Sequence, residues 1–319
     1  MTRFAGKWSG GLAAAALAAL FGAPGALAGA VTLGTAGDYA ILIGNNDSVT
    51  LSSVQLSAGA TVAVGTYNGK SNPSSFSVTG TSLSLVEGGY GNGCTSSNTA
   101  KCKSYTNVSG FSSTTLDPSL FATGGSGEPL QDALNAASYA AGETAIHSYS
   151  SVTSNLTLNA LSAASDNVFD IGTLDLQSGA CLTLNDGAFT GAKFVINVTG
   201  SFTIGSTGCI KLAGHTKSSD VIFNVESGVS TVSITGNTNV FSGTLLAPSS
   251  NVSISDTTIA GQIIAGISNV GKSYTMDCSP TVNFNAFVPT RAPEPASLAL
   301  FGVGLAALGA LRRRRSAQT

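Results

Sequence analysis

The sequence predicts a mainly β protein: an irregular right-handed parallel β-helix, or β-solenoid, with one long α-helix packed alongside it. Three observations predict this fold. Short β-branched runs alternate with turn residues along the chain, one segment near the middle has helical periodicity, and a strand motif repeats at a short offset. A separate signal helix at the N-terminus and a transmembrane helix at the C-terminus are predicted to flank this body.

The N-terminal segment, residues 1–28, has the features of a secretory signal peptide. Arg3 and Lys7 precede an apolar stretch. Ala26 and Ala28 then frame an A-x-A cleavage signal, which marks a segment that is removed on export. We therefore expect the mature body to begin at residue 29.

Short apolar runs separated by Gly, Asn, Ser or Asp fill much of the body. Runs that are rich in β-branched residues and bounded by turn residues predict strands. The predicted strands lie at 39–43, 49–56, 61–64, 76–86, 156–161, 174–176, 194–198, 221–225, 232–234, 245–247, 252–254 and 259–265. A helical bundle is excluded, because only 9% of the residues are charged and a bundle needs charged outer faces.

One segment has a different period. From Pro129 onwards, apolar residues that include Leu130, Leu134 and Ala137 recur at intervals of three and four, which predicts one amphipathic helix over about 129–147. His147 would then lie near the C-terminal end of this helix, where the helix dipole favours a cation.

An internal repeat indicates how the strands are arranged. The segment from Gly243 to Val252 aligns without a gap with the segment from Gly261 to Val270. Looser matches that share an Asn-Val step or a similar run lie at 194–198, 222–225 and 169–172. Repeats at such short offsets are typical of a β-solenoid, in which each coil stacks its strands on those of the next coil.

The C-terminal end combines three features in a fixed order. Pro293, Glu294 and Pro295 are followed by an apolar run at 296–311, and that run ends in the four arginines Arg312, Arg313, Arg314 and Arg315. The positive-inside rule keeps such arginines in the cytoplasm. The run therefore predicts a transmembrane helix that stops the transfer of an exported chain.

This arrangement over 292–315 resembles the PEP-CTERM sorting signal. The resemblance implies recognition at the inner membrane by an exosortase-type transpeptidase, followed by cleavage near Pro293, Glu294 and Pro295. It also implies release or attachment at the surface or in the extracellular matrix of a cell that makes exopolysaccharide. These three residues would then be a processing site for another enzyme, and the chain would contact the inner membrane only transiently.

The body, residues 29–291, resembles the choice-of-anchor A family of bacterial surface domains. The segments 244–252 and 259–266 carry most of this resemblance, and Gly37-Asp-Tyr-Ala-Ile-Leu near the start is compatible with it. The order of early strands, a helix and further rungs also resembles the ice-binding β-helix family, in which a long helix lies beside a right-handed β-helix.

The cysteine content agrees with export into an oxidising compartment. Cys94 and Cys102 could close a small loop, and stacked rungs would give Cys181 a route to Cys209. The total of five leaves one cysteine unpaired or paired between chains. The chain has no C-x-x-C, and neither histidine stands near a cysteine pair at ligand spacing, so we expect no metal site and no cofactor.

Composition and motifs favour a non-enzymatic function. With 14 Lys+Arg against 16 Asp+Glu, the chain lacks the basic face that nucleic-acid binding needs. We expect an exported cell-surface or extracellular-matrix protein that is associated with exopolysaccharide or biofilm. Exopolysaccharide would be the partner of a flat β face that carries Ser, Thr and Asn.

Two alternatives belong to other classes. An ice-binding protein needs regularly spaced threonines on a flat face, but the expected outward positions, which include Thr203, Ser233 and Ser253, are mixed. A polysaccharide-degrading enzyme needs two carboxylates about 5–10 Å apart. The nearest candidates in sequence are Asp166, Asp170 and Asp175, which we interpret instead as residues that cap turns at the corners.

Overall fold

The computed structural model describes residues 30–289, except 46, 73, 96, 123–127, 237–239 and 268–271. The predicted signal peptide, the sorting segment 292–315 and the predicted transmembrane helix at 296–311 lie outside the described residues. Within the described part, no helix combines the length and the apolar content that crossing a membrane requires.

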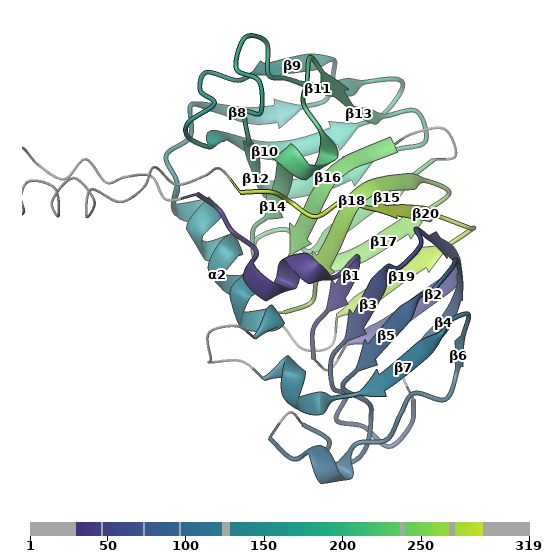
Figure 1. The fold of residues 1–319 in the computed structure, drawn as a ribbon. Helices are drawn as coiled ribbons and strands as arrows, with labels where there is room; N and C mark the ends of the chain where they lie inside the picture. Colours follow the sequence, from purple (N-terminus) through teal and green to yellow (C-terminus); the bar gives the residue numbers. More distant parts are fainter. Residues whose placement is uncertain are drawn as a thin grey trace, which may run out of the picture.

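The described chain forms a β-solenoid with one α-helix along its side, as the sequence predicts (Figure 1). The strands form one sheet of 17 strands and one of 3 strands. Every pairing between named strands is parallel. The solenoid has three faces, which we call the helix face, the hydroxyl face and the third face.

The helix face is the side that α2 (Pro129–Gly142) covers. Its strands stack in an order that differs from their order in the chain. The stack runs through β8 (His147–Val152), β10 (Asn167–Leu176), β12 (Phe194–Ile204), β14 (Val221–Val225), β16 (Val240–Ala247), β18 (Thr258–Ala265), β1 (Ile41–Ile43), β3 (Thr61–Val64), β5 (Ser84–Glu87) and β7 (Ser113–Leu116).

The other two faces follow from the same rungs. The hydroxyl face contains the second halves of β10 and β12, followed by β15 (Thr231–Thr235), β17 (Asn251–Ser255), β19 (Ser273–Asp277), β2 (Ser48–Leu56), β4 (Ser75–Thr79) and β6 (Val108–Ser109). The third face contains β9 (Leu156–Asn159), β11 (Cys181–Asn185), β13 (Cys209–Ala213) and β20 (Thr281–Phe284), together with the starts of β16 and β18.

The N-terminal rungs stack on the last C-terminal rungs, at a boundary that we call the seam. β1 pairs with β18, and β2 pairs with both β19 and β20. From β7 the chain passes through a 3-10 helix, η3 (Pro118–Phe121), and α2 to β8 at the opposite end of the stack. Figure 1 shows this path as purple and blue strands at one end, green strands in the middle and teal strands at the other end.

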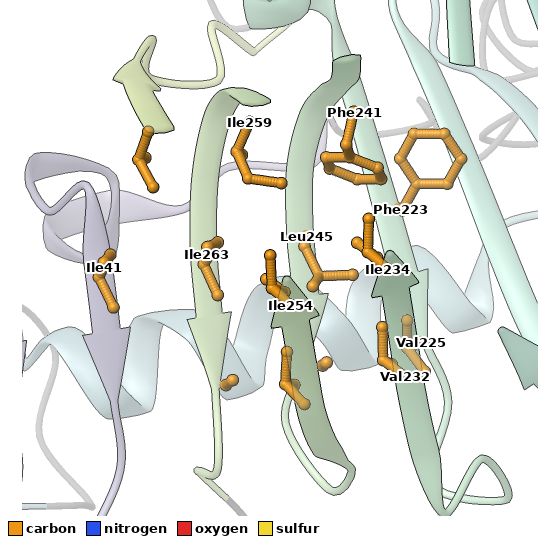
Figure 2. Close-up of a cluster of buried hydrophobic side chains, with 14 of the residues drawn as sticks. Ile41, Phe223, Val225, Val232, Ile234, Phe241, Leu245, Ile254, Ile259 and Ile263 are labelled. Carbon is orange, nitrogen blue, oxygen red and sulfur yellow. The ribbon is translucent and has the colours of Figure 1, made fainter. Parts of the chain in front are cut away.

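Inward side chains form continuous apolar columns along the solenoid. One column on the helix face runs through Ile196, Phe223, Leu245, Ile263 and Ile41. The aromatic rings of Phe202, Phe223 and Phe241 meet in the middle, with centroids 5.1 to 6.3 Å apart. Figure 2 shows five of these side chains projecting between the strands: Ile41, Phe223, Phe241, Leu245 and Ile263. Burial of this kind, at roughly 25 cal/mol per Å² of apolar surface, is the main stabilising contribution.

The helix α2 ends earlier than its periodicity predicts, at Gly142 instead of about 147. Two amide side chains of the helix face bind its last turns: Asn224 Nδ2 donates to Ala137 O, and Asn197 Nδ2 donates to Ala140 O. The backbone N–H of Ile146 already pairs with Val168 O. The chain therefore pairs with the sheet before the helical pattern of apolar residues ends.

His147 is therefore not at the helix end. It opens β8, five residues beyond the last helical residue, and its ring stacks on Phe169 with centroids 6.4 Å apart. The sequence interpretation of His147 as a partner of the helix dipole is wrong, because the residues that follow Gly142 join the sheet.

The strand predictions differ from the structure in two informative places. The predicted run 76–86 is two strands, β4 and β5, separated by a turn in which Ser82 has a φ of 55°. The repeat at residues 243–247 and 261–265 is confirmed residue by residue, but Val252 pairs with Tyr274, four residues beyond the position that the repeat predicts. The corner that follows Ala265 is four residues longer than the one that follows Ala247, which shifts the register.

Candidate binding face and groove

A column of polar side chains follows the outward side of the hydroxyl face. Its members occupy equivalent positions on neighbouring strands, and we call it the central column. It runs through Asp175, Thr203, Ser233, Ser253, Thr275, Thr50 and Ser75. With a strand spacing of about 4.8 Å, this column extends over roughly 29 Å. Six hydroxyl groups therefore face outward in a row, with one carboxylate at the end.

Strict alternation holds the central column on the surface. On β15, Val232 and Ile234 are buried on either side of Ser233, and β17 and β19 repeat this pattern. Shorter columns flank the central one. Thr231 pairs with Asn251 and Ser273 with Ser48 on one side, whereas Thr235, Ser255 and Asp277 align on the other. The face thus presents hydroxyl and amide groups with little charge.

A groove lies at the β4 and β6 end of the hydroxyl face. Its volume is about 430 Å³. It is lined by Thr50, Leu51, Ser52, Ser75, Phe76, Ser77, Thr106, Asn107, Val108 and Ser109. A register shift in β2 between Leu51 and Val54, where Ser53 has a φ of 57°, bends the strand beside the groove. The lining combines hydroxyl and amide groups with the apolar side chains of Leu51, Phe76 and Val108, which suits a polar molecule with an apolar side.

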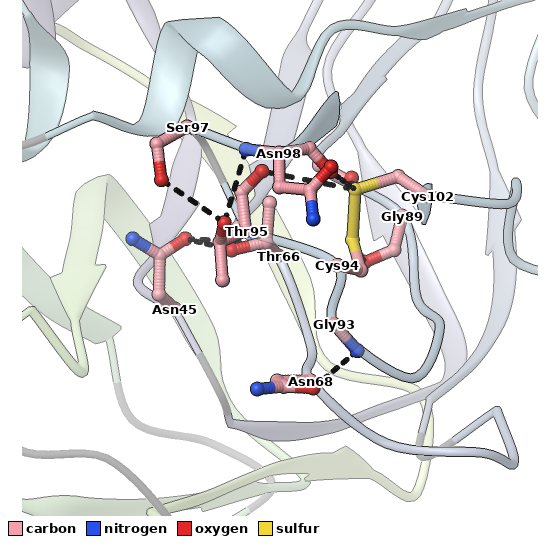
Figure 3. Close-up of a disulfide and its surroundings, with 12 residues drawn as sticks. Asn45, Thr66, Asn68, Gly89, Gly93, Cys94, Thr95, Ser97, Asn98 and Cys102 are labelled. Carbon is pink, nitrogen blue, oxygen red and sulfur yellow. Dashed lines mark hydrogen bonds between the residues drawn. A yellow bond between two sulfur atoms is a disulfide. The ribbon is translucent and has the colours of Figure 1, made fainter. Parts of the chain in front are cut away.

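A disulfide-closed loop adjoins this end of the solenoid (Figure 3). Cys94 is joined to Cys102, with Cα atoms 4.7 Å apart. Asn68 Oδ1 accepts a hydrogen bond from the backbone N–H of Gly93 at 2.7 Å, which ties the loop to the preceding rung. The stacked rings of Tyr90 and Tyr105, with centroids 5.9 Å apart, connect the base of the loop to the core.

Two of the other cysteines lie on the third face, and the last one lies in the corner between β19 and β20. Cys181 on β11 is joined to Cys209 on β13, and these two residues are also direct neighbours in the strand register. Cys278, which follows β19, is exposed and carries a free thiol. Stacked rungs thus bring Cys181 and Cys209 together, whereas Cys278 is the odd cysteine.

The three candidate catalytic carboxylates have separate positions and partners. Asp166 Oδ2 accepts from the backbone N–H of Val31 at 2.9 Å. Asp170 lies on the helix face, where its Oδ1 accepts from Asn197 Nδ2 at 3.1 Å. Asp175 lies on the hydroxyl face and accepts from Gln177 Nε2 at 2.8 Å. Asp170 and Asp175 both lie inside β10 but on different faces, which does not suit a pair that works on one glycosidic bond. The interpretation of these two residues as caps of corner turns is wrong, because β10 runs through both positions.

Two buried carboxyl groups lie at the corner between the helix face and the hydroxyl face. Asp47 is 2% exposed; its Oδ1 accepts from the backbone N–H of Lys272 at 2.8 Å, and burial raises the pKa of Asp47 to about 8. Glu87 accepts from the backbone N–H of Tyr105 at 3.0 Å, and burial likewise raises its pKa. Burial therefore favours the protonated form of both carboxyl groups, which lie in the interior of this corner.

His215, the second histidine, pairs with a buried carboxylate on the third face. Its backbone N–H donates to Asp186 Oδ1 at 2.8 Å, and its Nδ1 lies 3.8 Å from Asp186 Oδ2. Asp186 directly follows β11, and its backbone N–H donates to Thr216 Oγ1 at 3.1 Å, so this pair lies at the end of the third-face strands.

Sequence reasoning recognised the outward positions Thr203, Ser233 and Ser253 but judged them irregular. The structure places them in one column, which Thr275, Thr50 and Ser75 extend. The sequence does not reveal this column, because the rungs differ in length and no fixed offset relates these residues. The last members also come from the N-terminal part of the chain.

Comparisons with known proteins agree with this architecture. A model of ice-binding-like adhesive domains matches residues 22–273, and a model of the PEP-CTERM protein-sorting motif matches residues 291–315. A search of curated proteins finds no match.

Solved structures of ice-binding proteins share the fold. One from Shewanella frigidimarina is 16% identical, with a TM-score of 0.51, over 81% of this chain and 98% of that chain. A glycosylated one from an Arctic yeast is 18% identical, with a TM-score of 0.50, over 83% and 96% of the two chains. One from an Antarctic biological consortium is 17% identical, with a TM-score of 0.50, over 82% and 91%.

These likenesses show the β-solenoid fold, and the family models show the family. The PEP-CTERM motif implies export, passage through a membrane, processing by an exosortase-type system and surface display. The protein therefore belongs to the family of ice-binding-like adhesive domains and carries a PEP-CTERM sorting motif at its C-terminal end.

Proposed function

We propose that this protein is a non-enzymatic adhesive of the cell surface or extracellular matrix, and that its hydroxyl face binds a neutral exopolysaccharide. The central column carries this proposal, because six outward hydroxyl groups recur from strand to strand. A hydroxyl group can both donate and accept hydrogen bonds, as sugar hydroxyls do. An extended polymer would therefore find a partner at each rung.

Weak contacts that repeat suit this role. A single exposed hydrogen bond contributes only about 0.5–1.5 kcal/mol, so that affinity must come from many rungs acting on one polymer. The carboxylates Asp175 and Asp277 are the charged members of the columns described above, which disfavours an acidic polymer. The groove beside Thr50 and Ser75 offers one deeper site for a sugar unit at the end of the column.

The sorting step places the face outside the cell. We propose that residues 1–28 are removed during export and that the body, residues 29–291, is released or attached after a cut near Pro293, Glu294 and Pro295. The helix at 296–311 and Arg312 to Arg315 would hold the precursor in the inner membrane before this cut. The match to the sorting motif over residues 291–315 supports this route.

Two measurements test the proposal. Mass spectrometry of the extracellular fraction should find a C-terminal peptide that ends near Pro293 and lacks Arg312 to Arg315; an intact tail in a membrane fraction would contradict the processing route. Co-sedimentation with exopolysaccharide from the producing cells should show binding by the secreted protein.

Matched variants then locate the binding surface. Ser253 is an exposed member of the central column. The variant Ser253→Lys should lower the affinity for exopolysaccharide on the order of tenfold, because a long side chain interrupts the column. Thr183→Lys places the same side chain on the third face and should bind as the unchanged protein does. Equal loss in both variants, or no loss in Ser253→Lys, would argue against the hydroxyl face.

Ice binding is the second candidate. The strand-by-strand recurrence of hydroxyl groups in the central column favours it, and the solved relatives of the same fold are named as ice-binding proteins. Thermal hysteresis of the secreted protein separates the two candidates. Hysteresis that disappears in Ser253→Lys, together with no binding to exopolysaccharide, would replace the first candidate with the second.

A further inference from the structure

Both ends of the described chain leave the solenoid at one corner, where strands of the helix face begin. The backbone N–H of Val31 donates to Asp166, directly before β10, and the backbone N–H of Val288 donates to Ser219 O at 2.8 Å, directly before β14. β10 and β14 are the two neighbours of β12, so that the ends lie two strand spacings apart, about 10 Å. We call this region the exit corner.

The body holds the C-terminal end firmly up to this point. Phe287 is 5% exposed and packs in the apolar cluster beside α2, and its backbone N–H donates to Gln262 Oε1 at 3.1 Å. Val288 follows with 52% of its surface exposed. The folded solenoid therefore ends at the exit corner, and the chain beyond it begins on the surface.

Little chain separates this corner from the sorting motif. Pro293 comes four residues after Pro289, so the covalent chain can span at most ~14 Å between them. An enzyme that encloses the motif needs walls around its active site, and one helix is already about 10–12 Å thick. The covalent chain therefore keeps the folded body within about 14 Å of the motif while such an enzyme binds it, so that their surfaces come close together.

We propose that the exit corner is a docking surface for the transpeptidase that processes the sorting motif, and that the folded body contacts this enzyme there during the cut. Exposed Lys217 and half-buried Ser219 lie beside Val288 in this corner. The corner thus presents the exposed apolar side chain of Val288 and the charged side chain of Lys217, which fits a partner surface with an apolar patch and an acidic group beside it. This inference depends on the sorting step and is independent of what the hydroxyl face binds.

The test measures how fast the full-length precursor becomes the processed form, by pulse–chase in cells that contain the transpeptidase. In the double variant Lys217→Glu and Val288→Glu, processing should be on the order of tenfold slower, because both contacts of the docking surface are lost. Thr183→Glu, on the third face, is the matched control and should be processed at the unchanged rate.

A linker distinguishes docking from a folding defect. Twelve Gly/Ser residues inserted after Pro289 add about 17–21 Å of average reach, so the enzyme no longer needs to touch the body. The double variant with this linker should be processed at nearly the unchanged rate. Limited proteolysis of each precursor checks that the body is folded.

Three outcomes would overturn the proposal. The first is an unchanged rate in the double variant without the linker, which would mean that the corner is not contacted or that the cut precedes folding. The second is a slow rate that the linker does not restore. The third is a photo-cross-linker at Ser219 that fails to capture the transpeptidase, although the same probe placed in the sorting motif does capture it.

Discussion

The helix face and the hydroxyl face are built on the same rungs, and β10 and β12 contribute to both. Their inward columns are equally apolar and buried. Their outward columns differ: Leu246, Ile264 and Leu42 lie under α2 on one face, whereas hydroxyl groups meet the solvent on the other. The inward residues therefore make the solenoid, and the outward residues decide whether a face is covered by the chain's own helix or stays exposed to solvent.

The largest difference in stability should appear when a lysine is placed at an outward position of each face. Ala63 is fully buried in the apolar cluster of the helix face, and Ser253 is exposed on the hydroxyl face. Ala63→Lys should lower the free energy of unfolding by more than about 4 kcal/mol, because it buries an unpaired charge. Ser253→Lys should change it by less than about 0.5 kcal/mol. Urea unfolding measures both, and similar losses would mean that the two faces do not differ as described.

The second largest loss of stability is expected when Gln262, which is fully buried on the helix face, is replaced. Its Nε2 donates to Gly37 O and Tyr39 O, and its Oε1 accepts from Phe287 N. Gln262→Leu should lower the free energy of unfolding by about 2–4 kcal/mol, because these groups lose their partner inside the protein. The exposed Gln177, changed to Leu, is the control. A neutral result for Gln262→Leu would show that water replaces the amide.

The pH dependence should report on Asp47 at the seam. Its pKa rises from about 3.9 in the unfolded chain to about 8 in the folded one. Between these values the unfolded chain has lost the proton that the folded chain keeps, so the free energy of unfolding should fall as pH rises from about 4 to about 8. Below about pH 4 the folded and the unfolded chain both hold the proton of Asp47, so the stability that is lost at higher pH is fully present.

Asp47→Asn should remove most of this fall, because an amide does not ionise. Denaturant unfolding at pH 4.5, 6 and 7.5 would measure the slope. Glu87, whose pKa burial also raises, should keep a residual slope of the same sign. A slope that is unchanged in Asp47→Asn would show that this carboxyl group is charged in the folded protein.

The smallest effect on stability should come from the central column. Thr275→Ala removes a partly exposed hydroxyl group, so the free energy of unfolding should change by no more than about 0.5 kcal/mol. Binding to exopolysaccharide should nevertheless weaken in a measurable way. A destabilisation above 1 kcal/mol would show that the column supports the fold and not only the contact with a partner.

Local sequence patterns predicted the stacking of neighbouring strands and the position of the helix. The Asn-Val step and the alignment of 243–247 with 261–265 predicted parallel stacking in the correct register. Pro129 and the recurring alanines predicted α2 and its start. Each of these signals depends on residues that repeat within one or two rungs.

Long-range arrangements could not be predicted in the same way. Ile41 pairs with Ile263 across the seam, and no repeat relates these two segments. Ser113 to Leu116 form an edge strand whose four residues are all exposed, so that β7 lacks an apolar pattern. The central column was missed for a related reason, since its members are aligned by corners of unequal length and by the seam.

The seam also determines when the protein can fold. β1 lies between β3 and β18, so one edge of the N-terminal rungs has no partner until residues 258–265 have been synthesised. Contacts between such distant parts of a chain make folding slow, because a long loop must close before they form. Gln262 and Phe287 complete the same region from the far end of the body. The solenoid therefore becomes a closed cooperative unit only after almost its whole length has emerged.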